Sequence, residues 1–253
     1  MAFGETSAFA LNALSYVVML WALARIRAVT PLRPRGEGGW LAQLAAGARY
    51  AYGFLPTRCA LLLLAATSLT VHSYPSLMPW FAREVFDGDS RTLGLLVGAG
   101  GFGALSGMLY LALRPDIRGL LRLIGMMSAL AGAALVAFAL TTTLWIALPA
   151  LYVAGMGAML TAASTNTVLQ SIVPDELRAR VASLYVMSFL GMAPLGALVV
   201  GWVSELAGPA HTLAACGVLT LLAAAAYAAQ YPAIRRDIRA AYERLGLLSG
   251  PGR

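Results

Sequence analysis

The sequence predicts an all-α, polytopic membrane protein with about seven transmembrane helices, and three observations support this fold class. Of the 253 residues, 60% are hydrophobic and only 11% are charged, whereas soluble domains carry about 25% charged residues. Seven apolar stretches are long enough to cross a bilayer as helices. The arginines gather in every second connection between these stretches. A soluble globule, a disordered chain and a disulfide scaffold are therefore excluded.

The seven predicted spans are taken from the apolar stretches in chain order. They lie at residues 8–24, 60–80, 92–113, 119–139, 144–164, 181–203 and 210–231. The first stretch is followed by Arg25 and Arg27, whereas a cleavable signal peptide carries its positive charges in front. We therefore interpret this stretch as a transmembrane helix.

Basic residues indicate the orientation, because cytoplasmic loops near the membrane collect them. All 18 basic residues are arginine, and only Arg83 and Arg91 fall on one side of the predicted membrane. The other 16 are Arg25, Arg27, Arg33, Arg35, Arg49, Arg58, Arg114, Arg118, Arg122, Arg178, Arg180, Arg235, Arg236, Arg239, Arg244 and Arg253. This asymmetry predicts an inner-membrane protein with its N-terminus outside and its C-terminus in the cytoplasm.

The chain divides into four parts on this topology. They are a first transmembrane helix (1–27), a cytoplasmic loop (28–58), a six-helix transmembrane part (59–232) and a basic cytoplasmic tail (233–253). Residues 40–55 and 233–248 show helical spacing of apolar side chains, which is typical of helices lying on membrane lipids. For 40–55, binding to a protein partner is the alternative.

Glycines mark the third and sixth spans. Gly98, Gly100 and Gly103 match the GxGxxG pattern of dinucleotide sites, but no strand precedes them and they lie within an apolar stretch. Small residues at such spacing favour close packing of helices in lipid. We expect this role for Gly94, Gly98, Gly103, Gly107, Gly191 and Gly196.

His72 is the only titratable side chain predicted deep within a span. Ionisable groups in the membrane are candidates for function, because burying a charge there is costly. Two roles are open for His72. Its neutral imidazole bonds to a neighbouring helix, or it contacts the substrate or a proton. Polar residues also end the fifth span, where Asn166 and Gln170 share one helical face. They either form hydrogen bonds between helices or line a polar pathway. The candidate residues of such a pathway are His72, Tyr74, Asn166, Gln170 and Tyr185.

A charged segment follows the fifth span. Asp175 comes directly after Pro174, as is typical of a helix start, where acids meet the positive end of the helix dipole. A structural role suffices for these charges. The alternative is an ion-pair latch of Asp175, Arg178 and Arg180 that differs between conformations.

Residues 165–181, TNTVLQSIVPDELRARV, resemble the segment between the tenth and eleventh helices in the enterobactin-exporter-like branch of the major facilitator superfamily. Residues 10–27, with LNALSYVVMLWALARIR, resemble the sixth helix of that branch. Residues 50–58 and 77–85 and the glycine-rich third span are similar to features of the branch as well. The resemblance covers nearly the whole chain.

The resemblance implies that the spans are similar to helices six to twelve of a twelve-helix transporter. It implies secondary active efflux of a siderophore- or drug-like small molecule, with no cofactor, and an N-terminal transporter half as a partner that this sequence lacks. A gating role at the cytoplasmic loop would fall to Asp116 and Arg118. Any proton-coupling acid is expected in the lacking half, unless His72 serves.

Other functional classes have less support in the sequence than a transporter. A half without transport activity of its own is not distinguished from the first interpretation by the sequence. A seven-helix receptor shares the topology, but a retinal protein needs a lysine and the chain has none. An intramembrane serine enzyme using Ser106 has no evident partner histidine, so we expect no catalytic residues. We also expect no metal site and no binding of nucleic acid.

Overall fold

The computed structural model describes residues 5–25, 40–114, 116 and 119–244, and these contain helices and turns but no strand. The chain forms two compact units, residues 1–38 and 39–253. The first unit contains α1 (Glu5–Arg25), which covers the first predicted span. Its 21 residues make a helix about 31 Å long at 1.5 Å per residue, close to the thickness of a bilayer core.

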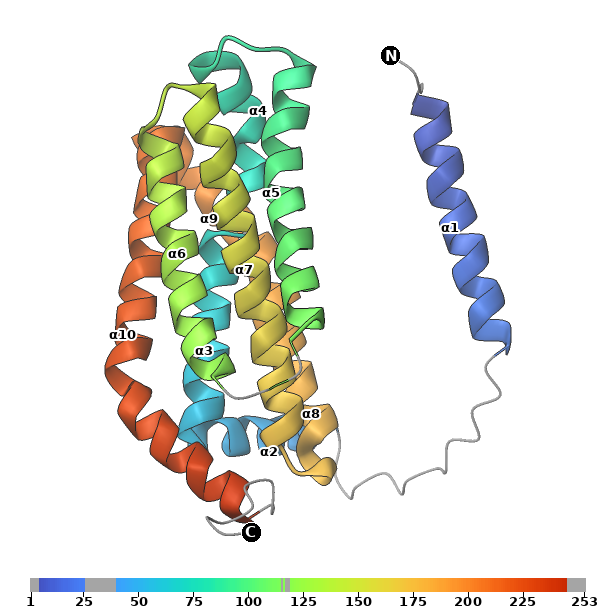
Figure 1. Ribbon diagram of the computed structural model, residues 1–253, viewed down its shortest axis with the longest axis vertical. Coiled ribbons are helices and arrows are strands. Elements are labelled where there is room, and N and C mark those ends of the chain that lie inside the picture. The colour runs from blue at the N-terminus through green and yellow to red at the C-terminus, as the bar shows by residue number, and fades with distance from the viewer. Residues whose placement is uncertain (1–4, 26–39, 115, 117–118, 245–253) are drawn as a thin grey trace. The chain divides into compact units, whose positions relative to one another are not determined.

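The second unit is a helical bundle (Figure 1). Six of its segments are long and apolar enough to span a membrane: Leu55–Val85, Ser90–Ala112, Leu120–Leu140, Leu144–Ile172, Asp175–Ala207 and Pro209–Ile238. The prediction of an all-α, polytopic membrane bundle is confirmed. Before the first of these segments comes α2 (Trp40–Gly53), within the predicted helix 40–55.

The first of the six segments is broken. It comprises α3 (Leu55–Thr70), a 3₁₀ turn η1 (Tyr74–Leu77), α4 (Met78–Trp80) and a π turn η2 (Phe81–Val85). The prediction of one span at 60–80 was therefore too short and too regular. Pro75 and Pro79 lack the N–H that a continuous helix needs, and the carbonyl of Thr67 accepts from the N–H groups of both Val71 and His72, at 2.8 and 3.3 Å.

The next two segments agree with the predicted spans within two residues: α5 (Ser90–Ala112) and α6 (Leu120–Leu140). Asp89 caps α5, because its Oδ1 accepts from the N–H groups of Arg91 and Thr92 at 2.9 and 3.2 Å. Such a side chain satisfies N–H groups that have no partner within the helix.

Helix α7 (Leu144–Ile172) extends eight residues beyond the predicted end at 164. Two of its threonine hydroxyls bond to carbonyls of the preceding turn, so these polar residues are accommodated within the helix. Thr161 donates to Gly157 at 2.8 Å and Thr167 to Ala163 at 3.0 Å. The helix stops before Pro174, which disfavours helical geometry at the residue in front of it.

The last two segments are also longer than predicted. They comprise α8 (Asp175–Val186), a π turn η3 (Met187–Gly191), α9 (Met192–Ala207) and α10 (Pro209–Arg244). The helix start at Asp175 is confirmed. Helix α10 continues through Pro232, so the predicted span at 210–231 and the first part of the predicted tail belong to one helix.

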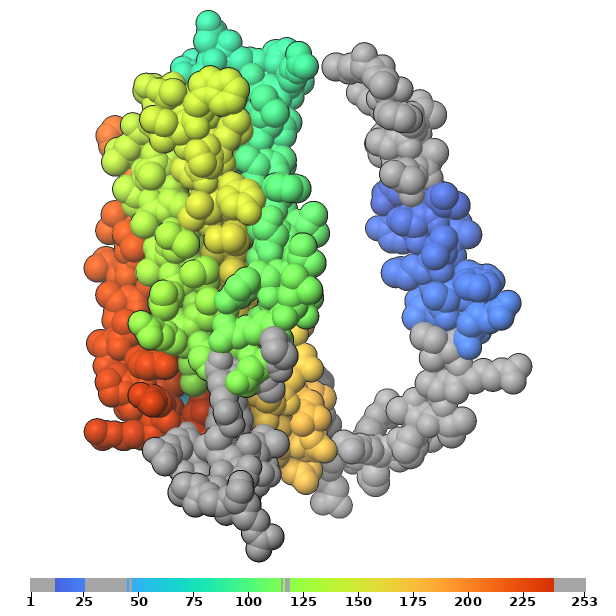
Figure 2. Space-filling view, viewed as in Figure 1, coloured from blue at the N-terminus to red at the C-terminus, as the bar shows by residue number. Residues whose placement is uncertain are grey.

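The bundle is an arc of helices around α3. Helix α5 packs on α7, α7 on α6, α6 on α10, and α3 contacts α10, α9 and α7. The side chains of α5, α6 and α7 fill the spaces between their ribbons (Figure 2). Helices α5 and α9 stand at the two ends of this series and are the least covered. Only 22% of the most apolar window of Ser90–Ala112 and 11% of that of Asp175–Ala207 are buried, against 61% for Leu55–Val85.

Buried hydroxyls connect α3 to its neighbours. The Oγ1 of Thr67 lies 2.9 Å from the Oγ of Ser128 on α6, and that of Thr70 lies 2.7 Å from the Oγ1 of Thr220 on α10. Interhelical bonds of this kind contribute about 0.6 kcal/mol each in a membrane. They fix the position of α3 at the centre of the arc.

Glycines allow the closest approaches. A Cβ added to Gly103 on α5 would meet the backbone carbonyl of Tyr152 on α7, and one added to Gly107 would meet that of Met156. Gly196 on α9 lies against the carbonyl of Leu69 on α3. At the remaining predicted packing positions, no described atom outside the backbone of the same helix and the adjoining residues lies within 4 Å of an added Cβ: Gly94, Gly98 and Gly191.

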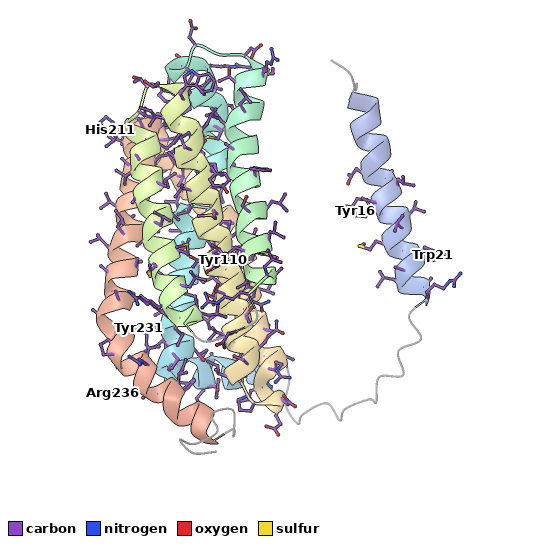
Figure 3. All side chains as sticks on the ribbon, in the orientation of Figure 1. Tyr16, Trp21, Tyr110, His211, Tyr231 and Arg236 are labelled. Carbon is purple, nitrogen blue, oxygen red and sulfur yellow. The ribbon has the colours of Figure 1, made fainter. Side chains whose placement is uncertain are left out.

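The two ends of the bundle differ in charge. His211 lies near one end of α10 and Arg236 toward the other (Figure 3). The His211 end also carries Arg83 and Arg91, which lie beside the connection into α5. The opposite end carries Arg49, Arg58, Arg114, Arg122, Arg178, Arg180, Arg235 and Arg236, and the last turns of α10 there also contain Arg239 and Arg244.

Candidate functional site

His72 lies just beyond the end of α3, where the segment leaves regular helix. Its ring meets Phe189 of η3 edge to face, with ring centroids 5.0 Å apart and an interplanar angle of 89°. The Nδ1 atom is buried and has no hydrogen-bond partner among the described residues. A buried polar atom without a partner is costly, so this nitrogen is a candidate contact for a bound molecule.

Phe189 also contacts Tyr185 of α8. The two rings stack with centroids 5.9 Å apart and an interplanar angle of 28°. The hydroxyl of Tyr185 donates to the carbonyl of Ala162 on α7 at 3.2 Å. Side chains from the α3 end, η3 and α8 are thereby joined to α7.

Asn166 and Gln170 continue along the same face of α7, because they follow Ala162 at steps of four residues. The Nε2 of Gln170 donates to the Oδ1 of Asn166 at 3.0 Å. Asn166 is half-buried and Gln170 is exposed. The structure therefore joins His72 and Tyr185 through Phe189, and the bond from Tyr185 meets α7 one helical turn before the Asn166–Gln170 pair. We refer to the set as the polar–aromatic cluster: His72, Phe189, Tyr185, Asn166 and Gln170.

Tyr74, the fifth predicted residue, is not part of this cluster. It is 8% exposed, and its hydroxyl lies against Gly100 of α5. Phe189 was not among the residues predicted from the sequence. Its position four residues after Tyr185 was the available signal, but the π turn at Met187–Gly191 that places it cannot be read from the sequence.

Further polar atoms lie near the cluster along the chain. The hydroxyl of Ser68 on α3 and those of Ser164 and Thr165 on α7 are buried and have no hydrogen-bond partner within the described part of the chain. Ser68 precedes His72 by one helical turn, and Thr165 adjoins Asn166. Polar groups of this kind are concentrated on the two helices that support the cluster.

The predicted latch residues lie at the arginine-rich end. The Nη2 of Arg178 is 2.6 Å from the Oδ1 of Asp175, and both side chains are exposed. Both also belong to α8, so the pair does not join two elements, and an exposed pair contributes about 0–1 kcal/mol. Arg180 packs against Gly47 of α2.

The predicted loop residues are described in part. The backbone carbonyl of Asp116 accepts from the Nε of Arg114 at 3.1 Å. Arg118 lies outside the described residues. The hydroxyl of Ser106 donates to the carbonyl of Phe102 in its own helix at 2.8 Å. Within the described residues, no group of histidine, cysteine and acidic side chains is arranged to hold a metal ion.

The chain was compared with known protein families. It matches the family model of transmembrane secretion effectors, which are transporters of the major facilitator superfamily, over residues 1–243. No curated protein matches it. The match extends over nearly the whole chain and agrees with a bundle of apolar helices of membrane-spanning length. This multi-pass membrane protein therefore belongs to the transmembrane secretion effector family of major facilitator transporters.

Proposed function

We propose that this protein exports a small amphipathic molecule, siderophore- or drug-like, by secondary active transport, and that the polar–aromatic cluster lines the route. The observation that carries the proposal is the unbroken series of contacts from His72 through Phe189 and Tyr185 to α7. Together with Asn166 and Gln170, the series brings together side chains from the α3, α7 and α8–η3 segments of a transporter-family bundle.

The chemistry of the cluster suits such a molecule. Two aromatic rings offer stacking surfaces, while the imidazole and two amides offer hydrogen bonds. Ligand sites combine apolar walls with a few polar groups that fix orientation. The cluster contains no acid, so we propose that a coupling acid lies elsewhere in the complete transporter unless His72 carries the proton.

A second six-helix half completes the route in this proposal. The least covered helices, α5 and α9, expose apolar side chains that include Phe102, Leu105, Leu198 and Trp202. By the resemblance to the enterobactin-exporter-like branch, these helices correspond to the ones that pack between halves. The two halves would rock around the route to alternate access. A longer gene product or a separate chain can supply the second half, and without it we expect no transport.

We propose that the arginine-rich end faces the cytoplasm of the inner membrane, because basic residues accumulate on that side. The His211 end then faces outward, together with Asp89 and Glu84. Export would carry the substrate from the arginine-rich end, where Gln170 lies, past Tyr185 and Phe189 to His72.

Asn166→Ala, Gln170→Ala and the double variant test the route. Each single variant is expected to lower efflux about fivefold, which corresponds to the loss of one hydrogen bond of about 1 kcal/mol. The double variant should be no worse than the more severe single, because the two amides act as a bonded pair. The measurement is efflux of ethidium and secretion of siderophore from cells that produce the complete transporter.

Gln230→Ala is the matched control, because Gln230 is an exposed amide on α10 outside the cluster. It should leave efflux unchanged, and blots of the membrane fraction should show equal abundance for all variants. Unimpaired efflux in Asn166→Ala and Gln170→Ala would remove both amides from the route.

A further inference from the structure

A groove with a volume of about 640 Å³ runs between α6 and α10, away from the polar–aromatic cluster. The two helices lie side by side along one edge of the bundle (Figure 1). Met126 and Ala129 form one wall, and Leu222, Ala225 and Ala228 form the other. These walls are apolar, and both helices are candidate membrane spans. The groove therefore suits a hydrocarbon chain rather than a polar solute.

Tyr227 also lines the groove, and its hydroxyl is not free to bind a ligand. The ring of Tyr227 lies where a Cβ added to Gly125 would be, at 2.9 Å from Cδ1, so the absence of a side chain at Gly125 makes room for the ring. The hydroxyl of Tyr227 donates to the carbonyl of Leu121 at 3.1 Å. Since this hydroxyl is already bonded, Tyr227 presents its ring to the groove and does not need a polar group of a ligand as a partner.

One end of the groove is cationic. Arg122, in the first turn of α6, lines the groove together with Tyr231 of α10. Arg122 is exposed, and no described carboxylate pairs with it. The positive end of the α6 dipole adds to its charge. Arg235 follows Tyr231 by one helical turn and is exposed as well.

We propose that this groove binds an anionic phospholipid, with an acyl chain along the apolar walls and the phosphate at Arg122. A guanidinium pairs with phosphate oxygens through two parallel hydrogen bonds. The headgroup level is the right depth, because Arg122 lies in the first turn of α6, a helix of 21 residues that is long and apolar enough to span the bilayer. A zwitterionic lipid fills the walls equally well but brings no net negative charge to the arginine.

Native mass spectrometry of the full chain in detergent micelles tests the site with two lipids of identical acyl chains. The unmodified protein should retain phosphatidylglycerol about fivefold better than phosphatidylcholine, the effect expected for one arginine near an anionic headgroup. Arg122→Gln should abolish this preference. Ala225→Phe, which fills the groove, should reduce the retention of both lipids.

Arg49→Gln is the control for diffuse charge, because Arg49 is an exposed arginine at the same end of the bundle but on α2. It should keep the preference for phosphatidylglycerol. The proposal is overturned if the unmodified protein shows no preference, or if both arginine variants lose it equally. Retention of both lipids by Ala225→Phe at the original level would also overturn it.

Discussion

Gly103→Leu is expected to prevent stable folding of the bundle. A Cβ at this position would meet the backbone carbonyl of Tyr152, and backbone atoms cannot move aside cheaply. The same interface brings Gly155 of α7 against the carbonyl of Gly100, so α5 and α7 approach closely over more than one turn. Overpacking of this kind costs about 1–3 kcal/mol for smaller insertions. Thermal unfolding of the purified protein and its abundance in membranes measure the effect.

Gly98→Leu is the matched control on the same helix. No described atom outside the backbone of the same helix and the adjoining residues lies within 4 Å of a Cβ at Gly98, so the folding of the described bundle should tolerate the change. If a second half packs on α5, as proposed, this variant should lose efflux while it keeps its abundance. Equal destabilisation by Gly98→Leu and Gly103→Leu would contradict the packing account.

His72→Phe should lower efflux up to about tenfold, the largest loss expected from one hydrogen bond to a transported molecule. Phenylalanine retains a ring against Phe189 but removes the two nitrogens. The variant therefore separates hydrogen bonding from packing. Efflux and membrane abundance are measured as for Asn166→Ala.

His72→Gln tests the same site from the other side, because it restores hydrogen bonding without an aromatic ring. It should recover part of the efflux lost in His72→Phe. A purely structural histidine would give the reverse order, with His72→Phe close to the unmodified protein and His72→Gln impaired. That order would exclude His72 as a contact of the route.

Much of the fold could be predicted because the bilayer requires long apolar helices. The spans of α5 and α6 were predicted within two residues. The errors arose where polar residues or prolines lie inside helices. In α7 the hydroxyls of Thr161 and Thr167 bond back to their own helix, and α10 continues through Pro232. Hydropathy alone does not distinguish such residues from loop residues.

The candidate site could be predicted only residue by residue. His72, Asn166 and Gln170 stand out because polar side chains within apolar stretches are expensive. His72 is joined to Tyr185 by Phe189, whose place follows from the π turn at Met187–Gly191. A π turn shifts the helical register and is frequent at functional sites, but no sequence pattern here marks it. Tyr74 was predicted to line the same route as His72, but it lies in a 3₁₀ turn with its hydroxyl against Gly100 of α5.

The most direct test of a solvent-exposed route is the reactivity of a cysteine at Phe189, in a protein whose buried Cys59 and Cys216 are replaced by alanine. Phe189 lies near the middle of the Asp175–Ala207 span, and Leu130, an exposed leucine near the middle of α6, is the control at similar depth. Thiols react as thiolates, which need water or another polar environment. We predict that a membrane-impermeant maleimide labels Phe189→Cys much faster than Leu130→Cys in cells that produce the complete transporter. Equal, slow labelling of the two cysteines from both sides of the membrane would contradict it.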